Sequence, residues 1–214
     1  MTTAAPAGGA GGAALPGGQQ REPSARQEEL LELAYRYVLA HGLADMSLRP
    51  LARAIGSSPR VLLYLFGSKD GLIRALLERA RQDELAVIGA FGVQNGPADL
   101  AGTAGQVWQW LSDPSVRHLL GLWVEAYARS LVDPGGPWAG FGEQTVQDWL
   151  GLLAARQPPD QRESAAGAAE RTAVLAVLRG AMLDLLATRD TARTGRAVAR
   201  SLEAVRSPVQ ARKR

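Results

Sequence analysis

Cysteine is absent from the 214-residue sequence, which excludes disulfides and thiolate metal ligands. No apolar run approaches the roughly 20 residues that span a bilayer, and the N-terminus lacks the charged and apolar blocks of a signal peptide. We therefore expect a soluble, cytoplasmic protein. Long alternations of apolar and polar residues are also missing, which argues against β-strands.

Helix-forming residues are abundant. Ala and Leu dominate a chain in which 46% of residues are hydrophobic and 21% charged, and this composition favours an all-α fold with a substantial core. The net charge of +3 is mild. Its distribution along the chain is therefore more informative than its size.

Gly, Pro and Ser divide the chain into segments. The Gly-, Ala- and Pro-rich start offers little apolar surface to bury, so we expect it to be disordered, and Asn95-Gly96-Pro97 marks a break. The predicted organisation is a tail over 1–24, a three-helix domain over 25–70, a connecting helix over 71–94, a larger helical bundle over 95–206 and a basic tail over 207–214. About nine to ten helices are expected, over 25–40, 48–55, 58–67, 68–91, 98–112, 115–132, 137–156, 160–188 and 191–206.

Residues 48–62 fit a helix-turn-helix, in which two short helices cross closely. Ala52 is small enough for the second helix to approach, Gly56 can adopt the positive φ of the turn, and Leu62 can fill the crossing. Leu51 and Ile55 complete this small core. The pattern predicts a DNA-reading second helix.

The second helix begins with a capping Ser58 and with Pro59 at the first position. Arg60 is the candidate for a base edge, although arginine binds phosphate as readily. Tyr64, one turn on, could reach a phosphate or lie in the core. Lys69 begins the next helix, where a phosphate is favoured.

Charge is concentrated in this region. Residues 45–75 hold five basic residues, Arg49, Arg53, Arg60, Lys69 and Arg74, against Asp45 and Asp70. The local excess of three matches the net charge of the whole chain, as expected for a DNA-binding face. Arg53 and Arg74 are expected to be solvated rather than bound to DNA.

The stretch "MSLRPLARAIGSSPRVLLYLFGSKDGLIRAL" resembles the DNA-binding region of TetR-family transcriptional regulators. The resemblance rests on Ser47, Ala52, Gly56, Phe66, Ser68, Lys69 and Asp70, and the sequence departs from the family pattern at Pro50, Arg60 and Leu63. It implies a homodimer that binds a palindromic double-stranded DNA operator and a small effector. The DNA contacts expected from the residues and the resemblance together are Ser47, Arg49, Ser58, Pro59, Arg60, Tyr64 and Lys69.

All five tryptophans follow residue 100. Each could simply fill the core, but pockets between bundle helices are also lined by aromatic groups with a few polar ones. We hypothesise an effector pocket lined by some of Trp108, Trp123, Tyr127 and Trp149, with His118 or Glu125 supplying polarity.

The helix expected over 160–188 carries small residues on one face, and part of it, "LRGAMLDLLATRD", is similar to the dimerisation helix of the same family. Ala169, Ala173, Ala176 and Gly180 would let two copies approach closely. The alternative is an ordinary buried helix.

The sequence also lacks catalytic and metal-binding patterns. Neither His41 nor His118 follows a Glu by three residues, no Gly-rich loop follows a strand, and no nucleophile has a nearby base. We predict no metal, no cofactor and no enzymatic activity. The predicted function is a ligand-responsive repressor; the alternatives are a helical enzyme, a ligand-binding protein without sequence-specific DNA binding, and a DNA-binding protein with a filled core and no effector.

Overall fold

The computed structural model describes residues 24–43, 46–93 and 99–206. Within them, ten α-helices and one short 3-10 turn form the molecule, and no strand occurs, so the all-α prediction is confirmed. The predicted N-terminal disorder over 1–23, the break at 95–97, Asp45 and the basic tail at 207–214 lie outside the described residues. Ser24, assigned to the tail, is instead the N-cap of the first helix and accepts a bond from the Gln27 amide.

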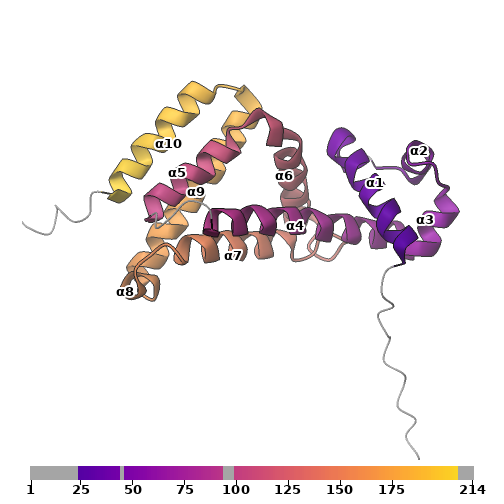
Figure 1. The fold of residues 1–214 in the computed structure, drawn as a ribbon, viewed down its shortest axis with the longest axis horizontal. Coiled ribbons are helices and arrows are strands. Elements are labelled where there is room, and N and C mark those ends of the chain that lie inside the picture. Colours follow the sequence, from indigo (N-terminus) through magenta and orange to yellow (C-terminus); the bar gives the residue numbers. More distant parts are fainter. Residues whose placement is uncertain (1–23, 44–45, 94–98, 207–214) are drawn as a thin grey trace, which may run out of the picture.

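Three helices form a small head at one end of the molecule (Figure 1): α1 (Ala25–His41), α2 (Leu48–Ala54) and α3 (Pro59–Phe66). Leu51, Ala52, Ile55 and Leu62 are all buried in it, as the helix-turn-helix pattern predicts. Gly56 has a φ of +64° in the turn between α2 and α3, which an L side chain rarely adopts.

The junction between α3 and α4 (Lys69–Val93) is equally tight. The Ser68 hydroxyl accepts a bond from the Gly71 amide at 2.9 Å. A Cβ at residue 71 would collide with the Phe66 carbonyl, so glycine is required for this close approach. The head is thereby attached firmly to the start of α4.

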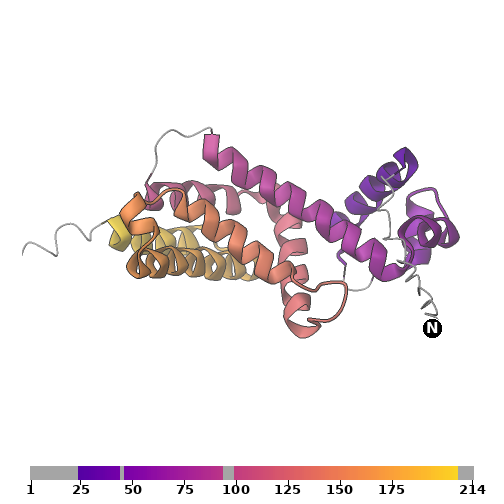
Figure 2. The same ribbon diagram turned by 90° about the horizontal axis from the view of Figure 1, so that it is seen from below.

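The long helix α4 runs from the head beside α7 (Phe141–Ala154), as Figures 1 and 2 show. The other helices of this bundle are α5 (Leu100–Leu111), α6 (Arg117–Val132), the short α8 (Pro159–Arg162), α9 (Ala165–Thr188) and α10 (Thr191–Arg206). A 3-10 turn over Pro114–Val116 precedes α6. One hydrophobic core extends from the head into this bundle. None of the described helices is long and apolar enough to cross a membrane.

Two predicted helices are wrong in extent. The helix expected over 137–156 begins only at Phe141, because the preceding Gly140 adopts a left-handed φ of +76°. The helix expected over 160–188 is divided into α8 and α9. Ser164 starts α9 by accepting a bond from the Gly167 amide at 2.9 Å, and such a cap requires an extended, non-helical residue.

Candidate functional site

The exposed face of α3 is the first candidate site. Ser58 caps the helix by accepting a bond from the Val61 amide at 3.3 Å, and Pro59 occupies the first position. Only Leu62 of the helix is buried, while Arg60 is exposed. The Tyr64 side chain is 84% exposed, so the alternative that it packs in the core is wrong.

Apolar side chains are exposed on the same short helix. Val61 is 39% and Leu63 40% exposed, next to Arg60 and Tyr64. A surface that combines a guanidinium, a phenol and aliphatic groups can contact phosphates, base edges and thymine methyl groups.

The other residues of the predicted DNA-contact set surround α3. Ser47, Arg49 and Lys69 are exposed. Within the described residues, Arg49, Arg60 and Lys69 form no ion pair with an acidic residue. Ser47 is the N-cap residue of α2, but its side chain makes no capping bond. Its hydroxyl therefore stays free for another partner.

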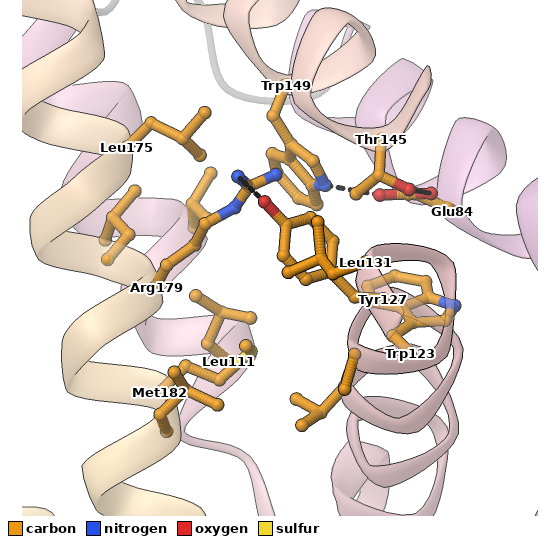
Figure 3. A pocket seen from close by; sticks show the side chains of 15 residues that line it. Glu84, Leu111, Trp123, Tyr127, Leu131, Thr145, Trp149, Leu175, Arg179 and Met182 are labelled. Carbon is orange, nitrogen blue, oxygen red and sulfur yellow. Dashed lines mark hydrogen bonds between the residues drawn. The ribbon is translucent and has the colours of Figure 1, made fainter. Parts of the chain in front are cut away.

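A cavity of about 320 Å³ lies inside the bundle. Helices α4, α5, α6, α7 and α9 supply its walls, which are almost entirely apolar, and Trp123, Tyr127 and Trp149 are among the lining residues (Figure 3). Leu131 and Leu183 also line it and are 67% and 49% exposed, so α6 and α9 place apolar groups where the cavity meets the surface.

Three residues of the predicted pocket lie elsewhere. Trp108 is buried but packs between α5 and α10, beside Gly195. His118 is exposed near the start of α6, and the Glu125 carboxylate accepts a bond from the Leu43 amide of the head. Helical periodicity explains the position of Glu125, because it lies two residues from both Trp123 and Tyr127 and therefore points away from the face that they share.

Glu84 is a pocket residue that the sequence analysis missed. It is fully buried, and its carboxylate accepts bonds from Trp149 Nε1 at 2.5 Å and from Thr145 Oγ1 at 3.2 Å. Burial raises the pKa of Glu84, while these two hydrogen bonds oppose the rise. A signal was present: Glu84 follows Leu77 and Ala80 on the buried face of α4, where a carboxylate is unusual.

Arg179 on α9 was also missed. Its guanidinium points toward Tyr127 and Trp149 (Figure 3), with Cζ 5.0 Å from the centre of the Tyr127 ring. Nη1 lies 3.5 Å from the Tyr127 hydroxyl, at the limit for a hydrogen bond, and Nη2 is buried without a partner. Leu175, one turn earlier, marks this as an apolar face on which arginine is unexpected.

Direct contacts join the head to the helices around the cavity. The Leu43 amide donates to Glu125 of α6 at 2.9 Å, and the Tyr35 hydroxyl of α1 donates to Asp83 of α4 at 2.8 Å. Burial raises the pKa of Tyr35, and the bond to Asp83 adds to the rise. Glu32 of α1 also forms an ion pair of 3.0 Å with Arg79 of α4. The helices α4 and α6 therefore contact both the head and the cavity.

The predicted dimerisation residues lie on one side of α9. Ala169, Ala173, Ala176 and Gly180 recur at intervals of three or four residues, and all four are exposed. The alternative of an ordinary buried helix does not hold for this face. That a second copy covers the face stays a prediction.

No family model and no curated protein matches the sequence. Solved structures do match. A protein from a Rhodococcus species assigned to the TetR family of transcriptional regulators is 17% identical, with a TM-score of 0.68 over 86% of this chain and 100% of that one. The multidrug binding protein EbrR in complex with imidazole is 27% identical, with a TM-score of 0.60 over 82% and 88%. A TetR transcription regulator from Haloarcula marismortui is 18% identical, with a TM-score of 0.58 over 82% and 94%.

Proposed function

We propose that this chain, which has the fold of the TetR-family transcriptional regulators, is a homodimeric repressor that a small, largely apolar effector releases from a palindromic DNA operator. The observation that carries the proposal is the surface of α3. Ser58 caps this helix and Pro59 occupies its first position. Leu62 is buried in the head, while Arg60 and Tyr64 are exposed. A major-groove helix uses its N-terminal residues in this way.

Dimerisation follows from the geometry of DNA. Two reading helices must enter successive major grooves, whose centres are about 34 Å apart, and the described part of one copy contains a single such helix. The exposed small-residue face of α9 is the surface proposed for the partner. Two-fold symmetry would bring the same residues of both copies together there.

The cavity supports a response to an effector. Its size of about 320 Å³ disfavours the alternative of a filled core without a ligand. EbrR, which shares the fold, is a multidrug binding protein with solved complexes of imidazole and proflavin. An effector that binds one arrangement of α4 and α6 better than another would change the position of the head through their contacts.

A helical enzyme is the weaker alternative. It would need convergent acid and base groups, whereas the lining of this cavity contains a single carboxylate, and both oxygens of that Glu84 already accept hydrogen bonds. The cavity is therefore better suited to binding than to proton transfer.

Selection of bound sequences from a random DNA pool tests the proposal. The expected result is an enriched palindrome whose half-sites are about one helical turn apart or a multiple of it. Failure to enrich any sequence would contradict a sequence-specific regulator.

Arg60→Ala is expected to weaken binding to the selected site by about 1–3 kcal/mol and to relax specificity at one base pair. The loss should be measured by gel shift against both selected and random DNA. Arg129→Ala, at an exposed position of α6 in the bundle, is the control. An equal loss on all sequences would assign Arg60 to a phosphate instead of a base.

A further inference from the structure

The cavity contains two charged groups of opposite sign whose surroundings differ. Glu84 accepts bonds from Trp149 and Thr145, so the protein already supplies donors to both carboxylate oxygens. Arg179 lies across the same cavity and forms no ion pair among the described residues.

The guanidinium of Arg179 has unused hydrogen-bonding capacity. It carries five N–H donors, yet among the described residues its one contact with an acceptor is that of 3.5 Å to the Tyr127 hydroxyl, and Nη2 is buried without a partner there. A buried donor that lacks an acceptor costs about 1–3 kcal/mol, and more when it is charged. The protein alone therefore leaves this group unsatisfied.

The two groups also differ in how they can respond to burial. A buried carboxyl group can take up a proton and become neutral, and the raised pKa of Glu84 favours that response. A guanidinium does not lose its proton in proteins. Arg179 is thus the permanent charge in the cavity, and an anion is the partner that it lacks.

The other lining residues of the cavity favour a ligand that is otherwise apolar. Trp123, Tyr127 and Trp149 present aromatic surface, and Leu131 and Leu183 keep the exposed edge apolar. Arginine matches a carboxylate through two parallel hydrogen bonds. Arg179 lines the cavity, but its Nη2 is enclosed by protein, so a carboxylate would bind Nη2 only after the Arg179 side chain changes rotamer.

We propose that the effector is an amphipathic organic acid, with a carboxylate bound by Arg179 and an apolar, ring-sized body held among the aromatic residues. This inference rests on the proposed function, since it names the chemical class of the effector for the same cavity. A lipophilic cation held by Glu84 is the competing outcome.

Three probes with one aromatic body separate these outcomes: naphthylacetate, naphthylethanol and naphthylethylammonium, which are anionic, neutral and cationic. Binding to the full-length protein is measured by titration calorimetry. We expect naphthylacetate to bind at least about tenfold more tightly than either of the others, because a hydrogen bond to a charged group contributes about 1.5–3 kcal/mol.

Variants of Arg179 then test whether this residue binds the carboxylate of the probe. Arg179→Met should lower the affinity for naphthylacetate about tenfold or more and leave that for naphthylethanol within about twofold. Arg179→Lys should restore part of the loss, which guards against a folding defect in the Met variant. Arg129→Met, at an exposed position outside the cavity, is the matched control and should change neither affinity.

Tighter binding of the ammonium probe, lost in Glu84→Gln, would overturn the inference in favour of a cation site. Equal binding of all three probes, or no binding of naphthylacetate, would overturn it as well. These results are distinguishable from failure of the proposed function, because selection of DNA sequences does not depend on the effector. If the protein binds a palindrome but prefers the ammonium probe, the proposed function is supported and only the inference of an acidic effector is contradicted.

Discussion

Two serines at the starts of neighbouring helices have different environments. Ser58 accepts a bond from the Val61 amide, whereas Ser47 makes no side-chain capping bond. The difference matters because an N-cap serine contributes stability through this bond.

We expect Ser58→Ala to lower the free energy of unfolding by about 1 kcal/mol and Ser47→Ala to change it by less than about 0.5 kcal/mol. Urea unfolding of both variants measures the two values. Ser47→Ala is the matched control, since it removes the same hydroxyl from a cap position without a bond. Equal losses would mean that α3 is not stabilised by its cap.

Glu84 is a second residue with a testable property. Burial raises its pKa above the ordinary value of 4.5, with Asp148 adding to the rise and Arg179 opposing it. A carboxyl group whose pKa is raised by folding stabilises the protein below its unfolded pKa, and that contribution is lost as the pH rises through the folded pKa.

Glu84→Gln should therefore gain stability relative to the wild type as the pH increases from about 4.5 through the folded pKa, and the difference should then level off. Unfolding by urea at a series of pH values measures the difference. Parallel pH profiles of the two proteins would contradict a raised pKa of Glu84 in the folded protein.

At the scale of elements, α6 connects the cavity with the head. Tyr127 lies on its cavity side, while Glu125, two positions earlier, accepts a hydrogen bond from the Leu43 amide in the loop between α1 and α2. A shift of α6 caused by a ligand would thus change a hydrogen bond to the head.

We expect Glu125→Ala to accelerate hydrogen exchange of the Leu43 amide and to reduce the effect of a bound ligand on operator affinity, because the acceptor is lost. A factor of about ten in exchange corresponds to 1.4 kcal/mol, within the range for a bond to a charged group. Glu125→Gln keeps an acceptor and should retain most of the protection. Unchanged exchange in the Ala variant would exclude this bond as a link.

At the scale of the whole molecule, the exposed small-residue face of α9 is the surface proposed for a second copy. The small residues along α9 are exposed on a helix that otherwise packs into the bundle. In a two-fold dimer any substitution there occurs twice in the same interface.

Ala176→Glu should convert the dimer to monomers, because two carboxylates would be buried close together at a cost of several kcal/mol per ion. Operator binding should weaken with it, since two reading helices are needed. Sedimentation equilibrium and gel shift measure the two effects. Ala86→Glu, at an exposed position of α4, is the control and should remain dimeric; a dimeric Ala176→Glu protein would place the interface elsewhere.

Local chemistry explains why the head was predicted accurately. Ala52, Gly56 and Leu62 have backbone and packing requirements that act within a few residues, and Pro59 and Ser58 define a helix start regardless of the remaining chain. The same reasoning failed at Ser164, where a cap inside an Ala-rich stretch divides the predicted helix.

The cavity was predictable only in part, since its walls come from five helices that are distant in sequence. Trp123, Tyr127 and Trp149 were recognised by composition, but composition could not separate them from Trp108, which packs between α5 and α10. Glu84 and Arg179 are 95 positions apart in the numbering and lie in one cavity only because α4 and α9 pack around it.

The sequence by itself determined the all-α class, the helix-turn-helix and the exposed start of α3, because capping, turn conformation and helical periodicity are local properties. Only the tertiary structure decided which aromatic groups border a cavity, which charges share it and that Glu125 contacts the head. These three features depend on how the helices pack against one another. Packing depends in turn on the fit between side chains that are far apart in the sequence.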